Sequence, residues 1–497
     1  MTNSDYADLF TLTVPEILII VTAFVVLIVD LAEMRHRPTR LRMLTAAIIT
    51  TVGCLVSIYW LSQTGERSKY YDGMLVIDPL TQLMKQIILG MTVFTGLISI
   101  ESKFTEHVGE YFALILLATV GMMFLVSSEN LLMIFLSLEL LSLSLYVLTA
   151  FNKSSLESAE AGLKYFLFGG ISAAFMLFGL SLVYGLSGEI NLVRIADKLA
   201  QPPLDPLLVL ALVMVVVGFG FKIAAVPFHL WAPDTYQGAP VPSAAFIASG
   251  SKVASFFILA KVLMVGFLGQ GGSGDWRHFS QGWAPLIAIV AAGSILLGNL
   301  AAIAQSSVRR LLAYSAIAQA GYILIGLLAG KQQGLASVVF YTTTYALTVL
   351  GAFGVVSIVQ EASGEEKFSA FAGLARRAPL LSFCMMVFML SLAGIPPLAG
   401  FFGKFYLFAS AVGAGKSLGL LWLVIFAIGM SAVSLYYYLQ VLKQIYVAAP
   451  AVNAPALQVS LLGRAAIALL ALSVLVFGCA PDLLLERIMH SIKAVGL

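Results

Sequence analysis

Apolar segments, each close to the length of a membrane-spanning helix, recur from one end of the chain to the other. About 20 consecutive apolar residues in a helix cross the hydrocarbon core of a bilayer. Of the 497 residues, 60% are hydrophobic and 11% are charged, whereas about a quarter of the residues of a soluble domain are charged. The polar loops are too short to form a soluble domain. The sequence therefore predicts an all-α integral membrane protein, with residues 1–497 in one polytopic domain.

Fourteen spans fit the apolar pattern. They cover residues 13–32, 43–62, 80–99, 112–127, 129–150, 161–185, 205–228, 241–266, 283–303, 308–329, 335–360, 377–412, 419–446 and 462–480. The segment 377–412 is long enough for a helix, a break and a second half-helix. The polar start of the chain lacks the basic region of a signal peptide, so we expect the first span to be retained. An even number of spans places both termini on one side of the membrane.

Lysine and arginine are unequally divided between the two sets of loops. One set, here named the arginine-rich end, contains Arg35, Arg37, Arg40, Arg42, Lys103, Lys153, Arg309, Arg310, Lys367, Arg376, Arg377 and Arg464. The other set, the arginine-poor end, contains Arg67, Lys69, Arg194, Lys198, Arg277 and Lys331. Because cytoplasmic loops carry the excess of basic residues, we expect the arginine-rich end in the cytoplasm and both termini on the opposite side.

Two similar helices indicate an internal repeat. One ends in Ser-Gly-Glu at 187–189 and the other ends in the same three residues at 363–365. Each precedes an apolar segment that has a lysine near glycines and prolines. An odd number of helices separates the first from the second, so they have opposite orientations, as in inverted-repeat transporters. We expect two inverted five-helix repeats, each with a broken helix, at 112–266 and 283–446, flanked by helices in 13–99 and 462–480.

The sequence contains no motif of a redox or nucleotide-binding site. Cys54, Cys384 and Cys479 lie in separate apolar segments, and there are five histidines. Metal and iron–sulfur sites need clustered ligands, and no CxxC spacing or glycine-rich phosphate loop is present. The net charge of +3 comes from scattered basic residues, which does not indicate nucleic-acid binding. We therefore expect neither a metal nor a cofactor in this chain.

Several ionisable residues lie deep within apolar segments, where a charge is costly and usually functional. The alternative for a lysine is snorkelling, in which the long side chain reaches the headgroups. Glu139 lies nine residues from Asn130, about 14 Å along a helix. This is too deep for a carboxylate to snorkel, and its alternative role is structural pairing. Lys222 is flanked by glycines and Pro227, which predict an interrupted helix with a polar cavity, although snorkelling remains the alternative.

Two further lysines fit the same pattern. Lys252 lies ten residues past Pro242, about 15 Å into its segment, among small residues that leave space for water. Lys404 follows LAGIPPLAGFFG, where glycines and prolines predict the most strongly broken helix of the chain. Lys261 and Lys443 lie near the ends of their helices, and there we expect snorkelling.

Glu160 and Lys164 stand four residues apart at a helix start. A glutamate four residues before a lysine is a favourable helix pair, and this is one interpretation. In the other, Lys164 points inward and modulates Glu139 or Lys222.

Acids and bases of this kind suit proton transfer. Burial lowers the pKa of a lysine and raises that of a glutamate by up to about 3–5 units, and pairing reverses both shifts. Each pKa unit corresponds to ~1.4 kcal/mol, and moving one charge against 100 mV requires ~2.3 kcal/mol. Opening and closing one Glu–Lys contact therefore supplies an energy of the required size. Lysines are not ligands for Na⁺ or K⁺, which favours protons as the transported ion.

Three segments resemble the antiporter-like subunits of the proton-translocating NADH–quinone oxidoreductase, respiratory complex I. They are PFHLWAPDTYQGAPVPSAAFIASGSK at 227–252, VRRLLAYSAIAQAGY at 308–322 and LAGIPPLAGFFGKFYLF at 392–408. The resemblance covers nearly the whole chain, and within the family it is greatest to subunit N. Lys404 favours subunit N over subunit M, which looks like having a glutamate at this position. The resemblance does not extend to the long C-terminal lateral helix of subunit L.

The resemblance implies roles for individual residues. Glu139 matches the paired glutamate of the family, Lys222 the lysine of the broken helix, Lys252 the central lysine, and Lys404 the terminal residue of the second half. Supporting candidates are Glu160, Lys164, His229, Tyr314 and Gln319.

Other residues of the three motif segments have roles that the resemblance does not assign directly. Gln319 stands where some relatives have a histidine, and a glutamine cannot hold a transferable proton, so the link from Lys252 to Lys404 is expected to depend on water. His229 either titrates or serves in capping or packing. Pro233, Asp234 and Gly238 are interpreted as residues of loop geometry.

The resemblance also implies the function: a proton-translocating subunit of an enzyme, a translocase, without a redox centre of its own. NADH, FMN, iron–sulfur clusters and quinone are then bound by other subunits. The implied partners are subunits M, K and J, the lateral helix of subunit L, and the lipid of a bacterial inner membrane, with both termini in the periplasm. Two alternatives stay open, namely a subunit of a multisubunit cation/proton antiporter and a structural subunit that anchors other chains.

Overall fold

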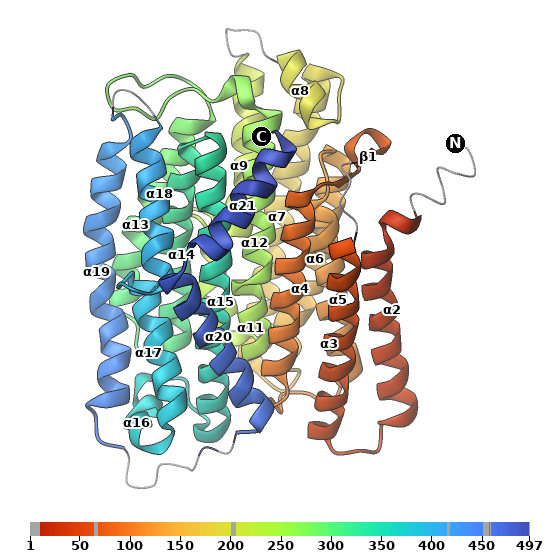
Figure 1. Cartoon of the computed structure of the whole chain (residues 1–497), viewed down its shortest axis with the longest axis vertical. Coiled ribbons are helices and arrows are strands. Elements are labelled where there is room, and N and C mark those ends of the chain that lie inside the picture. Colours follow the sequence, from red (N-terminus) through yellow and green to blue (C-terminus); the bar gives the residue numbers. More distant parts are fainter. Residues whose placement is uncertain are drawn as a thin grey trace.

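The protein is a bundle of long helices that run roughly parallel to one direction (Figure 1). The computed structural model describes residues 10–63, 68–199, 205–414, 418–450, 457 and 459–496. In these ranges, thirteen helices are long and apolar enough to cross a membrane. They match thirteen of the fourteen expected spans, and the fourteenth, at 377–412, is the shorter helix and half-helix anticipated there.

The N-terminal part consists of three spans and a small antiparallel sheet. Its elements are α2 (Val14–Ile28), which continues as a π-helical turn (Val29–Glu33), α3 (Thr39–Gln63), β1 (Ser68–Tyr70), a 3₁₀ turn (Tyr71–Gly73), β2 (Leu75–Ile77) and α4 (Pro79–Ser99). Asp78 starts α4 because its carboxylate accepts from the Thr81 amide while the Thr81 hydroxyl accepts from the Asp78 amide, a reciprocal cap.

The middle of the chain holds the first broken helix. Its elements are α5 (Val108–Val126), α6 (Leu131–Thr149), α7 (Leu156–Ser187), α8 (Leu192–Leu199), α9 (Pro206–Ile223), α10 (Trp231–Gly238), α11 (Val241–Ala248) and α12 (Gly250–Lys261), which continues as a π-helical turn (Val262–Gly266). A 3₁₀ turn (Leu268–Gln270) follows. Every residue of α11 and α12 is buried inside the protein.

The last part holds the second broken helix. Its elements are α13 (Trp283–Ile303), α14 (Val308–Leu328), α15 (Lys331–Ser363), a 3₁₀ turn (Phe368–Phe371), α16 (Leu374–Arg377), α17 (Pro379–Ala393), α18 (Ala399–Gly413), α19 (Leu421–Tyr446), α20 (Leu461–Cys479) and α21 (Asp482–Val495). In the 33-residue helix α15, 94% of the residues in the most apolar stretch are buried inside the protein. It packs against α4, α11, α12, α14, α17, α18, α20 and α21. The amphipathic α21, which the sequence pattern did not predict, crosses the bundle obliquely with α20 (Figure 1).

Two helix breaks lie where glycine and proline predicted them. After α9 the chain turns at Ala224, whose φ is +56°, and after α17 it turns at Gly394, whose φ is +88°. Prolines follow both turns and prevent the helix from continuing. Lys222 precedes the first break and Lys404 lies beyond the second, so the two lysines do not occupy matching places relative to the breaks.

The ends of α7 and α15 are alike. Each helix ends at a glycine in the left-handed region, Gly188 or Gly364. The serine before each glycine donates to the carbonyl of the residue after it, Glu189 or Glu365. These matching ends support the proposed inverted repeat.

Contacts between loops agree with the division into two ends. At the arginine-rich end, which lies at the bottom of Figure 1, Lys103 lies 3.7 Å from Glu361. At the arginine-poor end, Arg194 lies 3.1 Å from Asp72. Arg67 lies outside the described residues. Arg309 is buried and therefore does not act as a free loop charge.

Candidate functional site

Both helix breaks present backbone carbonyls to a buried lysine. The last carbonyls of a helix have no partner within it and carry partial negative charge. The Lys252 ammonium donates to the Ile223 carbonyl at 2.5 Å, at the end of α9. The Lys404 ammonium donates to the carbonyls of Leu392 at 3.0 Å and Ala393 at 3.3 Å, at the end of α17. Each break therefore supplies the oxygens that a lysine needs at membrane depth.

These lysines are enclosed by the protein. Exposed fractions are 7% for Lys222, 2% for Lys252 and 4% for Lys404. A snorkelling side chain would extend along the outside of the bundle, so this alternative is wrong for Lys222. It is also wrong for Lys261, for which snorkelling was expected: Lys261 is 5% exposed and lies 3.4 Å from the Glu129 carboxylate. Lys443, in contrast, is exposed near the end of α19.

Lys222 of α9 lies over the ring of Tyr146, which α6 carries together with Glu139. The Lys222 ammonium is 5.7 Å from the centre of the Tyr146 ring and makes no hydrogen bond to any residue that the structure describes. Glu139, half-buried on α6, interacts with Lys222 electrostatically. Tyr146 lies seven residues after Glu139, on the same face of α6. A Cβ atom at Gly169 would lie 1.9 Å from the Tyr146 hydroxyl, so the glycine provides the space for this ring.

Hydroxyl and amide groups surround Lys404. Its ammonium donates to the Ser431 hydroxyl at 2.8 Å and lies 4.9 Å from the centre of the Tyr322 ring. The Gln319 amide donates to the Leu392 carbonyl at 3.1 Å, the same oxygen that Lys404 contacts. Gln319 is therefore a direct neighbour of the Lys404 site.

The network around Gln319 extends through tyrosines. The Gln319 amide also donates to the Tyr438 hydroxyl at 3.2 Å, and the Tyr341 hydroxyl donates to the Gln319 carbonyl oxygen. The Tyr438 and Ser315 hydroxyls lie 2.5 Å apart. Sequence reasoning missed these residues, because tyrosines and serines in apolar segments carry no spacing signal that marks their partners.

Two of the supporting candidates, Glu160 and Lys164, lie at the arginine-rich end rather than beside the buried lysines. Lys164 lies 2.7 Å from both Glu160 and Asp234. Asp234 also accepts from Arg310 at 2.8 Å. Of the two interpretations of Lys164, the structure shows the helix pair and extends it to Asp234. Asp234 is thus a shared anion and not only a residue of loop geometry. Tyr314 lies beside Arg310.

His229 lies between α9 and α10 and is buried. Its ring contacts the Pro227 backbone, and its Nδ1 atom has no hydrogen-bond partner within the described ranges. These contacts fit packing at the break.

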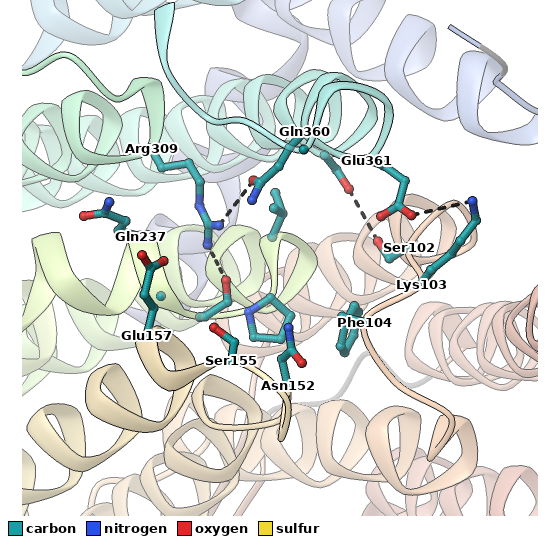
Figure 2. Close-up of a pocket in the computed structure, with 16 residues that line it drawn as sticks. Ser102, Lys103, Phe104, Asn152, Ser155, Glu157, Gln237, Arg309, Gln360 and Glu361 are labelled. Carbon is teal, nitrogen blue, oxygen red and sulfur yellow. Dashed lines mark hydrogen bonds and ion pairs between the residues drawn. The ribbon is translucent and has the colours of Figure 1, made fainter. Parts of the chain in front are cut away.

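A polar cavity of about 360 Å³ opens at the arginine-rich end. Figure 2 shows Arg309 reaching from α14 toward Gln360 of α15, with Glu157 of α7 and Lys103 on other sides. The Arg309 guanidinium donates to the Tyr236 carbonyl at 2.9 Å, to the Ala239 carbonyl and to Gln360 at 3.3 Å. The cavity therefore lies where the loop after α4 and helices α7, α14 and α15 meet, next to the start of α11.

In the part of the chain that the structure describes, no three histidine, cysteine, aspartate or glutamate side chains form a group able to hold a metal ion. The candidate site consists of lysines, a glutamate, backbone carbonyls and hydroxyls, groups that can exchange protons or bind water.

Comparison with known proteins places this arrangement in a family. The sequence profile described as "NADH:quinone oxidoreductase/Mrp antiporter, TM" matches residues 128–434. The chain is 53% identical over 495 residues to NADH-quinone oxidoreductase subunit N 2 of Acidobacterium capsulatum, covering 98% of this chain and 99% of that one. The chain belongs to the subunit N family of NADH-quinone oxidoreductases. The resemblance of its three motif segments to complex I is thereby confirmed.

Solved structures agree with this family. A chain of respiratory complex I from Thermus thermophilus with bound aureothin matches this subunit N family member with a TM-score of 0.78 and 33% identity, covering 95% of this chain and 98% of that chain. A chain of the Mrp complex from Dietzia sp. matches with a TM-score of 0.81 at 19% identity, covering 96% of each. At that identity the Mrp chain shows a shared fold alone.

Proposed function

We propose that this subunit translocates protons across the membrane within an NADH-quinone oxidoreductase. NADH, FMN, iron–sulfur clusters and quinone act on other subunits, and the chain contributes to the enzyme as part of its translocase. The observation that carries the proposal is the pair of buried ammonium groups at the two helix breaks. Lys252 and Lys404 contact carbonyls and a hydroxyl, and neither forms an ion pair with a carboxylate of the described residues. A buried lysine without a counter-ion readily loses its proton.

The proposed path has two half-paths joined by a polar axis. Glu139 and Lys222 form a switch, because a small displacement of Tyr146 or Lys222 brings carboxylate and ammonium into contact or separates them. Lys252 relays the proton, and Lys404 delivers it to the far side or to a neighbouring subunit. Gln319, with its hydroxyl partners, orders the water that connects the two lysines. The cavity beside Arg309 is the proposed entrance from the arginine-rich end.

The setting follows from the same proposal. The arginine-rich end faces the cytoplasm of a bacterium, the protein spans the inner membrane, and both termini are periplasmic. Residues 112–266 and 283–446 act as the two inverted repeats, with 13–99 and 462–480 as flanking helices. The proposed partners are subunits M, K and J and the lateral helix of subunit L.

Replacing Lys222 by alanine tests the switch. We expect proton pumping in membrane vesicles to fall several-fold, a loss of about 1 kcal/mol, while the complex still assembles. Proton uptake and NADH oxidation are measured together, with Lys443→Ala as the control because Lys443 is exposed. Full pumping by Lys222→Ala would reject the switch and favour a structural subunit.

A further inference from the structure

A second buried group of charges lies at the arginine-poor end, away from the proposed path residues. The Glu129 carboxylate is 2.6 Å from the Lys69 ammonium and 3.4 Å from the Lys261 ammonium. The side chains of Glu129 and Lys261 are 6% and 4% exposed, whereas that of Lys69 is 38% exposed. We name these three residues the far-end cluster. It extends from the interior of the bundle to its surface, and nothing in the proposed relay uses it.

The far-end cluster joins two of the helices that carry the path. Glu129 directly precedes α6, which carries Glu139, and Lys261 ends α12, which carries Lys252. Lys261 lies nine residues after Lys252, about 14 Å along a helix, and Glu129 lies ten residues before Glu139, about 15 Å. Any water that extends from the Lys252 level along α12 to the arginine-poor surface ends beside Lys261.

The backbone holds the far-end cluster firmly. The Glu129 amide donates to the Gly73 carbonyl at 2.8 Å, and the Glu129 carbonyl accepts from the Leu192 amide at 2.9 Å. Immediately after Lys261, α12 becomes a π-helical turn, a rare feature that is frequent at functional sites. The loop before α4, the start of α6 and the start of α8 therefore meet over the end of α12.

The chemistry of the far-end cluster opposes proton passage. The Lys69 and Lys261 ammonium groups face the Glu129 carboxylate, and the buried Asp78 carboxylate also acts on Lys261. The Lys261 ammonium forms no hydrogen bond with the residues described. Burial alone would raise the pKa of Glu129, but the charges of Lys261 and Lys69 outweigh it, so the pKa lies below its ordinary value. The carboxylate consequently stays ionised and does not accept a proton, and a proton that approaches from the surface meets Lys69 and then Lys261.

We propose that Lys261, Glu129 and Lys69 form an electrostatic seal that closes the arginine-poor end of α12 against the return of protons. The inference rests on the proposed function, because a seal is needed only where protons occupy a path at the level of Lys252. Lys261 is the inner positive charge of the seal, and Glu129 holds it in place.

The test is passive proton leak through the whole complex reconstituted into liposomes. A potassium diffusion potential set by valinomycin drives protons inward, without NADH or quinone, and an internal pH dye reports the rate. For Lys261→Met we expect the leak to rise about threefold or more, because a positive charge no longer opposes proton passage at membrane depth. Lys261→Arg keeps the charge and should leak like the unaltered complex.

A matched control is available in the same chain. Lys85 of α4 and Glu16 of α2 form another buried pair, 2.6 Å apart with side-chain exposures of 2% and 0%. Lys85→Met removes the same kind of charge at another place and should not increase the leak. A Lys261→Met leak no faster than that of the unaltered complex, or equal to that of Lys85→Met, would overturn the seal.

If Lys261→Met prevents assembly, Lys69→Met tests the outer charge of the same cluster. The expected result is a smaller but measurable rise in leak, and an unchanged leak would overturn the proposal. Because passive leak requires no turnover, this outcome is independent of whether Lys222→Ala impairs pumping. Failure of the seal and failure of the proposed relay are therefore distinguished.

Discussion

Proton translocation is expected to fall about tenfold or more when Lys252 is replaced by methionine, a loss of about 1.4 kcal/mol or more. Lys252 lies in α12, whose residues are all buried, and its ammonium contacts the carbonyl that the break leaves free at Ile223. Methionine has a similar length and no charge, so packing is retained while the proton-carrying group is lost. The protons moved per NADH oxidised are measured with the reconstituted complex and a pH dye.

Lys252→Arg separates two explanations of that result. Arginine keeps the positive charge but does not lose its proton in proteins. If Lys252 carries protons, the arginine variant should pump as poorly as the methionine variant. Recovery by arginine would show that only a fixed charge is needed, and normal pumping by Lys252→Met would exclude Lys252 from the path.

The largest effect on stability is expected for Asp30→Ala, which should destabilise the subunit by about 3–5 kcal/mol, the cost of leaving a buried charge without its partner. Asp30 accepts two hydrogen bonds from Arg42, at 2.8 and 2.7 Å, and one from the Gly109 amide at 2.8 Å. These contacts join the end of α2, the start of α3 and the first turn of α5. Thermal denaturation of the purified complex, followed by loss of the subunit, measures the change.

A surface pair provides the comparison for Asp30. Lys103 and Glu361 are 3.7 Å apart with side-chain exposures of 76% and 36%, and exposed pairs contribute between about 0 and 1 kcal/mol. Lys103→Ala should therefore leave the denaturation temperature nearly unchanged. Equal losses for Lys103→Ala and Asp30→Ala would contradict the special role of the Asp30–Arg42 pair.

The spans and the breaks followed from local sequence. Apolar length and the positions of glycine and proline depend on neighbouring residues, so α9 and α17 end near the predicted places. Depth counted along a helix also predicted that Lys252 is buried, because about 15 Å exceeds the reach of its side chain to the surface.

The partners of these residues did not follow from sequence, because they come from distant segments. Tyr146 joins Lys222 only through the packing of α6 and α9 on α7. Lys261 is near the end of its helix, and counting residues placed it at the surface. Loops from other parts of the chain fold over that end and bury it. Asp234 is likewise close to Arg310 only in three dimensions.

The long buried helix α15 constrains how this subunit can move. It is about 50 Å long at 1.5 Å per residue, and it packs on α11 and α12 from one half and on α17 and α18 from the other. A rocking of one half against the other would separate helices from this common axis and expose its apolar surface. The cheaper motions are side-chain rotations and small shifts of the short segments at the breaks. We therefore expect the buried lysines to be connected first to one side of the membrane and then to the other by water that enters and leaves their surroundings. The long helices keep their positions during this change.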